Sequence, residues 1–198
     1  MLALLICCIS YCFAARPDAK AVVATAASKL RKAPVVQAVF AVSSPNGASS
    51  GALTVSGKRF AMATPELKVW FDGRTQWAYA PQTGEVNITD PTAEELSASN
   101  PLSVLTNMTA SYNCRRLSSN ASSDVIELTP KGNTDIAKAV IKFSTATGLP
   151  VEIKVTDREH AMSTITISSL STGGKAPSAG AFRFTPKDYP GVEVVDLR

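Results

Sequence analysis

The sequence has 198 residues and a mass of 20.8 kDa, a length that predicts one domain with a substantial core. Hydrophobic residues make up 45% and charged residues 18%, which excludes a disordered chain and a coiled coil. The formal charge is +4, and the basic residues are scattered with no run longer than a pair such as Arg115 and Arg116, so we expect no nucleic-acid binding. One histidine and four cysteines, none at metal-ligand spacing, predict that the protein uses no metal or other cofactor.

Residues 1–15 predict a secretory signal peptide, which leaves residues 16–198 as a single mature domain. The stretch is uncharged and apolar, and it is shorter than the roughly 20 residues that a membrane-spanning helix needs. It lacks the basic residues that usually precede the apolar core of a signal peptide. The alternative is a lipoprotein signal with an acylated Cys12, although Tyr11 is large for the position before a modified cysteine.

Helical spacing of Val22, Ala26 and Leu30 predicts an amphipathic helix over 18–33, ended by Pro34. The apolar pattern then changes to alternation, which is typical of strands. The first group of predicted strands covers 35–43, 51–56, 58–64, 66–72, 75–80 and 84–89. Two short helices are expected within 91–109. A second group of strands covers 110–117, 124–129, 138–145, 150–157, 161–169 and 181–185, with a loop over 168–180 and a final extended piece at 192–197.

Direct hairpins without alternating helices predict antiparallel pairing throughout. A sheet of this size must curl, and its apolar face needs a cover, for which only a few helical segments are present. The sequence therefore predicts a mainly β protein, a large curved antiparallel sheet covered by short helices.

The sequence contains one motif that resembles a catalytic site. Residues 47–51 match the Gly-x-Ser-x-Gly pattern of serine hydrolases, but the flanking segments are both strand-like, which favours an exposed hairpin turn. His160 lies in a charged run that predicts a solvated turn, and Glu94 and Glu95 lie in an exposed helical turn. Cys114 is expected to be a buried structural thiol. These features predict a binding protein and no enzymatic activity.

Three motifs in order resemble LolA, the family of periplasmic carriers of outer-membrane lipoproteins. Residues 72–81 resemble its Asp-Gly-Lys-Thr-x-Trp-x-Tyr-x-Pro hairpin, and residues 182–198 resemble its C-terminal end. Residues 85–88, 94–96 and 100–102 look like the LolA-related proteins of the Bacteroidetes type. The resemblance implies an open half-barrel of about eleven antiparallel strands with a helical lid over an apolar cavity.

The resemblance also implies a function and its partners. Members of the family accept a triacylated lipoprotein from an ATP-driven release complex, an ABC transporter of the inner membrane, and pass it to an acceptor at the outer membrane. We accordingly expect a periplasmic, monomeric lipoprotein carrier without catalytic residues. Two alternatives keep the fold, namely an acceptor anchored to the outer membrane and a lipid-sensing domain.

The physical need for such a carrier is clear. Exposing an acyl chain to water costs about 0.8 kcal/mol per methylene group, so three chains cost on the order of 30 kcal/mol. The candidate cavity wall and lid are apolar side chains of the predicted strands and short helices. The wall comprises Phe40, Leu53, Phe60, Met62, Val69, Trp77 and Tyr79, and the lid comprises Leu102, Leu105 and Met108.

In LolA an Arg-Pro pair supplies an arginine that ties the lid shut by hydrogen bonds. The corresponding stretch here, Val55–Phe60, is shorter and has no proline. Arg59 is the candidate for this latch, with Lys58 as the alternative.

Overall fold

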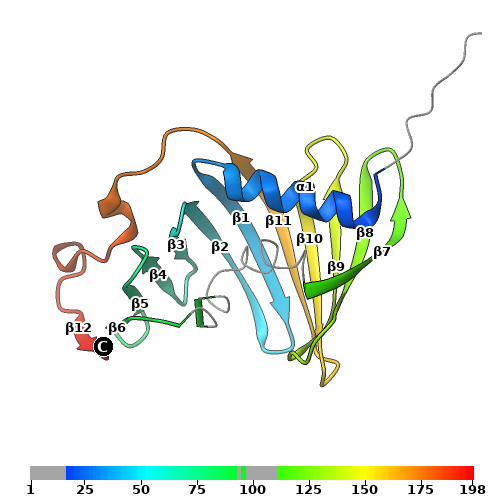
Figure 1. The fold of residues 1–198 in the computed structure, drawn as a ribbon. Coiled ribbons are helices and arrows are strands. Elements are labelled where there is room, and N and C mark those ends of the chain that lie inside the picture. The colour runs from blue at the N-terminus through cyan, green and yellow to red at the C-terminus, as the bar shows by residue number, and fades with distance from the viewer. Residues whose placement is uncertain (1–16, 93–94, 97–110) are drawn as a thin grey trace, which may run out of the picture.

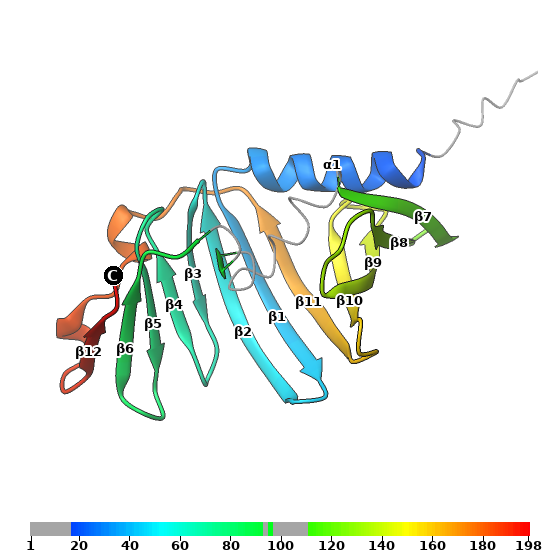
Figure 2. The same cartoon turned by 60° about the horizontal axis from the view of Figure 1, so that its bottom comes forward.

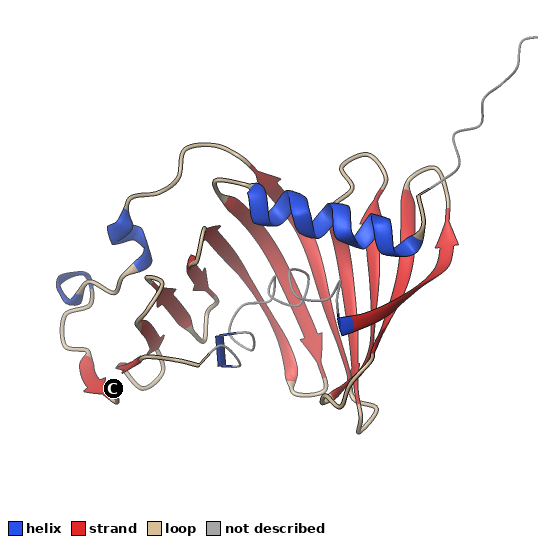
Figure 3. Cartoon of the chain, viewed as in Figure 1, coloured by secondary structure: helices blue, strands red, loops and turns tan. Residues whose placement is uncertain are grey.

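The computed structural model describes residues 17–92, 95–96 and 111–198. Within these ranges it includes one long helix, one twelve-stranded sheet and two short 3-10 helices (Figures 1 and 3). The first half of the chain forms α1 (Ala19–Lys32), β1 (Val36–Ser44), β2 (Gly47–Ser56), β3 (Arg59–Ala63), β4 (Lys68–Phe71), β5 (Gln76–Ala80) and β6 (Glu85–Thr89). The second half forms β7 (Tyr112–Ser119), β8 (Ser123–Pro130), β9 (Ile136–Ser144), β10 (Pro150–Asp157), β11 (Met162–Thr172), η1 (Ala179–Phe182), η2 (Pro186–Asp188) and β12 (Glu193–Asp196).

The strands lie in the order β12-β6-β5-β4-β3-β2-β1-β11-β10-β9-β8-β7. The sheet is open, because β12 and β7 stand at its two ends, and it bends around the face on which α1 lies (Figures 1 and 2). This architecture confirms the predicted open, mainly β fold with a helical cover. One pair departs from the prediction, because β12 lies parallel to β6. A parallel neighbour needs a long connection, which the chain between β6 and β12 provides.

Local sequence explains why α1 begins and ends where it does. The Asp18 carboxylate accepts a hydrogen bond of 2.6 Å from the backbone N–H of Ala21, which caps the first turn. Basic side chains in the last turn complement the helix dipole, and Pro34 follows the end. The buried side of the helix consists of Val23, Ala26, Ala27 and Leu30. The predicted helix over 18–33 is confirmed.

The first hairpin corrects the expectation for the hydrolase-like motif. Gly47 already belongs to β2, so residues 47–51 form a strand and the turn lies at 45–46. Gly51 faces Phe40 across the ladder, and a Cβ at Gly51 would lie 2.4 Å from the Ala63 carbonyl oxygen and 3.1 Å from the Phe40 ring. Gly51 is therefore required by close packing of the strands.

The segment after β11 differs from the prediction in two ways. Ser168 to Thr172 continue β11 past a bulge opposite Val39, so the loop begins only at Gly173. The expected strand at 181–185 is instead the end of η1 followed by irregular chain. The alternation of Phe182 and Phe184 comes from burial against the sheet, not from pairing with another strand.

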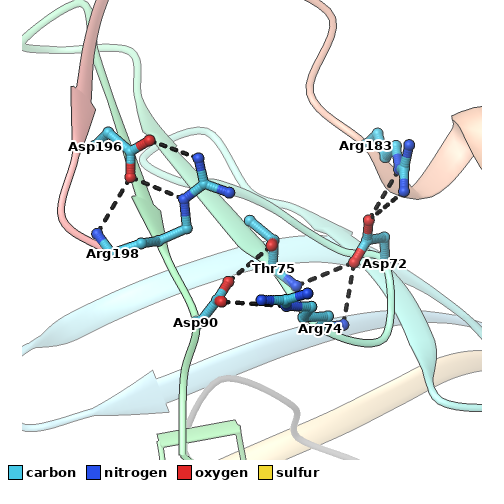
Figure 4. Close-up of polar contacts among 7 residues, drawn as sticks. All are labelled: Asp72, Arg74, Thr75, Asp90, Arg183, Asp196 and Arg198. Carbon is cyan, nitrogen blue, oxygen red and sulfur yellow. Dashed lines mark hydrogen bonds and ion pairs between the residues drawn. The ribbon is translucent and has the colours of Figure 1, made fainter.

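Polar contacts hold this C-terminal segment to the turn between β4 and β5 (Figure 4). Arg183 Nε donates a hydrogen bond of 2.9 Å to Asp72 Oδ2, and its Nη2 lies 2.7 Å from the same oxygen. Asp72 Oδ1 accepts from the backbone N–H groups of Arg74 and Thr75. Burial raises the pKa of Asp72, but these donors outweigh it and hold the pKa below the ordinary value.

Candidate functional site

The face of the sheet that carries α1, here called the inner face, collects five of the predicted wall residues. Cross-strand pairing places Leu53 opposite Met62, and Met62 opposite Val69. Residues directly opposite one another project from the same face. Phe40, Leu53, Phe60 and Val69 are at most 5% exposed, whereas Met62 is partly exposed. The structure therefore brings these five side chains together on one face, and Met62 is the most exposed of them.

Trp77 and Tyr79 lie on the opposite face, which corrects the predicted single wall. Trp77 pairs with Trp70, and Tyr79 pairs with Lys68, whereas their neighbour Ala78 pairs with Val69 of the inner face. Tyr79 and Trp70 form an outer aromatic cluster with Phe184 and Tyr189 of the C-terminal segment, and the ring centroids of Tyr79 and Tyr189 lie 4.9 Å apart. Alternation correctly indicated that Trp77 and Tyr79 share a face, but it could not assign that face.

Arg59, the predicted latch, contacts the C-terminal segment. Its guanidinium carbon lies 4.9 Å from the centroid of the Phe182 ring, and Phe182 is completely buried. Arg59 precedes the inward-facing Phe60 in β3, so strand alternation directs it away from the inner face. Among the described residues Arg59 packs against Phe182, and Lys58 is exposed in the β2–β3 turn, whereas the lid that either was predicted to hold lies outside these residues.

The predicted lid residues Leu102, Leu105 and Met108 lie outside the described residues. Just before them, Thr92 and Glu95 form a capping box. The Glu95 carboxylate accepts from the backbone N–H of Thr92 at 2.7 Å and from its hydroxyl at 2.9 Å. Leu96 follows and packs against the hydrophobic core. The predicted helix start near Pro91 agrees with this cap.

The sequence analysis missed the other half of the inner face. Partly buried apolar side chains pack against the core from six further positions, and they continue the surface that Met62 begins. They are Val42, Leu67, Tyr112, Cys114, Val155 and Ile165. The alternation at Ile153 and Val155, and at Ile165 and Ile167, carried the signal that would have identified two of these strands.

Polar groups border this apolar surface at both ends. Gln76 pairs with Phe71 and so shares the inner face, where its buried Oε1 has no hydrogen-bond partner among the described residues. At the other end, Arg116 donates to the Pro17 carbonyl at 2.6 Å and approaches Asp124 to 3.4 Å. The arrangement is an apolar strip with polar limits, which suits an elongated apolar ligand.

Among the described residues, the candidate catalytic groups Ser49, Cys114 and His160 lie on separate elements. The Ser49 hydroxyl donates to Glu66 at 2.6 Å and lowers the pKa of that carboxyl, while His160 occupies the β10–β11 turn with a φ of 67°. Burial raises the pKa of the Cys114 thiol, which disfavours the reactive thiolate. Within the described ranges, no cluster of three or more His, Cys, Asp or Glu side chains could hold a metal ion. In the same ranges, no helix has the length and apolar composition needed to cross a membrane.

Comparisons with solved structures support the fold. An uncharacterized conserved protein from Thermus thermophilus is similar with a TM-score of 0.61 and 10% identity, over 90% of this chain and 98% of that chain. MucB is similar with a TM-score of 0.54 and 16% identity, over 85% of this chain and 63% of the longer MucB chain. The comparison with curated proteins gave no match.

A family model supplies the identity that these low sequence identities do not. The model described as "Outer membrane lipoprotein carrier protein LolA" matches residues 10–168, which is most of the chain. This agrees with the resemblance in the hairpin motif and with the open sheet and its helical cover. The chain belongs to the LolA family of outer membrane lipoprotein carrier proteins.

Proposed function

We propose that this protein is a periplasmic carrier that shelters the acyl chains of lipoproteins against its inner face. The observation that carries the proposal is the strip of partly buried apolar side chains, from Met62 through Val42 and Ile165 to Tyr112, in a chain of the LolA family. A strip of this kind gives acyl methylene groups an apolar surface while the polar outer positions keep the complex in solution.

The inner face supports binding of moderate affinity. Its deepest residues, including Leu53, Ile141 and Phe143, are already buried against α1 and neighbouring strands, so a ligand gains contact chiefly with the partly buried positions. When a ligand must displace contacts within the protein, its binding free energy is only the difference between the free energies of the new and the displaced contacts. Moderate affinity suits a carrier, because very tight binding would prevent release.

The proposal extends to location and partners. Residues 1–15 would direct export, and the mature chain would move between a lipoprotein-releasing ABC transporter of the inner membrane and an acceptor at the outer membrane. The support for this part is the family membership and the apolar N-terminal segment. In this proposal the protein acts by binding alone.

Competition binding tests the proposal. The delipidated protein is loaded with a fluorescent long-chain fatty acid, and a synthetic triacylated lipopeptide is added as competitor, with the same peptide without acyl chains as the matched control. The proposal expects displacement by the acylated peptide only. Equal failure of both peptides to displace a bound probe, or no binding of the probe at all, would contradict it.

A further inference from the structure

Basic side chains from three separate segments meet at one rim of the sheet. The last turn of α1 supplies Lys29, Arg31 and Lys32. Val36, at the start of β1, pairs with Val55 on one side and with Thr172 on the other. The register therefore brings the β2–β3 turn, which carries Lys58, and the segment after β11, which carries Lys175, to the same rim as the end of α1 (Figure 2). The five basic residues, here called the basic rim, are all exposed.

Hydrogen bonds fix the three segments relative to one another. The Ser56 hydroxyl donates to the Pro34 carbonyl at 2.9 Å, which joins the end of β2 to the segment after α1. The backbone N–H of Gly173 donates to the Val35 carbonyl at 3.0 Å, which joins the end of β11 to the same segment. The basic rim is consequently a property of the folded sheet and not of flexible ends.

The basic rim has no acidic residues in the segments that form it. The sequence contains no Asp or Glu in residues 19–65, 136–151 or 160–187. The five basic residues carry more charge than the +4 of the whole chain, so the remainder of the chain is close to neutral. The helix dipole accounts for basic residues at the end of α1, but it does not account for Lys58 and Lys175, which come from a turn and a loop.

A groove with an apolar floor lies within the basic rim. Lys29 and Lys32 stand beside it, and its lining includes Ala33, Leu149 and Leu170. Lys29 Nζ donates to the Thr147 carbonyl at 2.8 Å, so this ammonium group is held at the edge of the groove. An apolar floor beside two ammonium groups fits a short segment that combines an apolar side chain with carboxylates.

We propose that the basic rim is the docking surface for an acidic segment of a partner protein. Charge complementarity carries the proposal, and the groove restricts the occupant to something narrower than a membrane surface. Membrane-surface elements also expose large apolar side chains, whereas the described large hydrophobic residues with high exposure all lie outside the three segments that form the basic rim. They are Val39, Leu117, Met162, Val194 and Leu197. Docking there would leave the strip from Met62 to Tyr112 free for cargo.

Two triple variants with the same change in net charge test this proposal. The rim variant carries Lys32→Glu, Lys58→Glu and Lys175→Glu. The control variant carries Lys138→Glu, Lys142→Glu and Lys187→Glu, which are exposed lysines outside the basic rim. Binding of a fluorescent peptide that alternates Glu-Glu with Leu is measured by anisotropy, together with binding to phosphatidylglycerol vesicles. Circular dichroism and fatty-acid binding show that each variant is folded and that its inner face is intact.

We expect the rim variant to bind the peptide about tenfold more weakly than wild type, and the control variant to change by less than about twofold, at an ionic strength of about 0.02 M. Raising the ionic strength to about 0.15 M should weaken binding of the peptide to wild type.

Equal losses of peptide affinity in the two variants would overturn the proposal, because they would show a response to net charge alone. Binding of wild type to the vesicles but not to the peptide would also overturn it, in favour of a membrane surface. Failure of the wild-type protein to bind the fatty acid would contradict the proposed carrier function, but the comparison of peptide binding by the two triple variants would remain valid.

Discussion

Replacing Met62 with glutamine separates ligand contact from core packing on the inner face. Met62 is partly exposed and pairs with Leu53 and Val69, so glutamine keeps the length of the side chain but makes the surface polar. A bound acyl chain would lose apolar contact worth about two methylene groups, or about 1.5 kcal/mol, which is roughly a tenfold loss of affinity. The amide can reach solvent at this position, so the cost in unfolding free energy should be only about 1 kcal/mol.

The neighbouring Phe60 provides the opposite case. Its side chain is 3% exposed and its ring centroid lies 5.6 Å from that of Phe71. Truncation to alanine should therefore lower the unfolding free energy by about 3–5 kcal/mol, as for other buried aromatic residues. The sequence suggested Phe60 as a ligand contact, but its burial makes Met62 the more discriminating position.

Fluorescent fatty-acid titration and urea unfolding measure the two quantities on the same samples. Val39→Thr is the matched control, because Val39 is an apolar residue on the opposite face of β1 and is 49% exposed. We expect Met62→Gln to change affinity and Val39→Thr to change neither quantity. The reasoning fails if Met62→Gln binds the probe as tightly as wild type, or if it unfolds as readily as Phe60→Ala.

Three further predictions concern other parts of the sheet. Gly51→Ala should lower the unfolding free energy by about 1–3 kcal/mol, because the new Cβ would collide with the Ala63 carbonyl oxygen. An unchanged urea midpoint would contradict this, because it would show that the neighbouring strand can shift without loss of stability. The pKa of Asp72 is lower in the folded than in the unfolded state, so the Asp72 carboxylate stabilises the fold above the unfolded pKa, and this stabilisation is lost as pH falls through the folded pKa. In thermal melts from neutral to acidic pH, the melting temperature of Asp72→Asn should therefore fall less than that of wild type. Identical dependence of the two melting temperatures on pH would contradict this. Cys114 should react with iodoacetamide more slowly than free cysteine, because burial raises its pKa, and more slowly still with fatty acid bound; a rate unaffected by fatty acid would place the ligand away from β7.

Alternation along the chain predicted the strands and the pairs of residues that share a face. Leu67, Val69 and Phe71 alternate along the predicted strand over 66–72, and the structure places all three in or against the core. Trp77 and Tyr79 were assigned to the wrong face because the face depends on the register across the turn at Gly73. That register sets Ala78, and not Trp77, opposite Val69.

The C-terminal segment was harder to predict for a related reason. Phe182 and Phe184 alternate as in a strand, yet the edge of β6 is occupied by β12, and the two rings are buried from the end of η1 and the irregular chain that follows it. Alternation indicates that one side of a segment is buried, but it does not indicate which strand, if any, pairs with that segment. Nor does it give strand direction, so the parallel pairing of β12 could be found only from the structure.

Native mass spectrometry tests the central claim most directly. The protein would be isolated from its own cells without detergent and sprayed intact, then dissociated to release whatever is bound. A carrier of lipoproteins should release acylated polypeptides, and Met62→Gln should carry less of them than Val39→Thr. Uniformly unliganded protein, or equal amounts of bound acylated polypeptide on both variants, would contradict the assignment of the inner face as the lipid-binding surface.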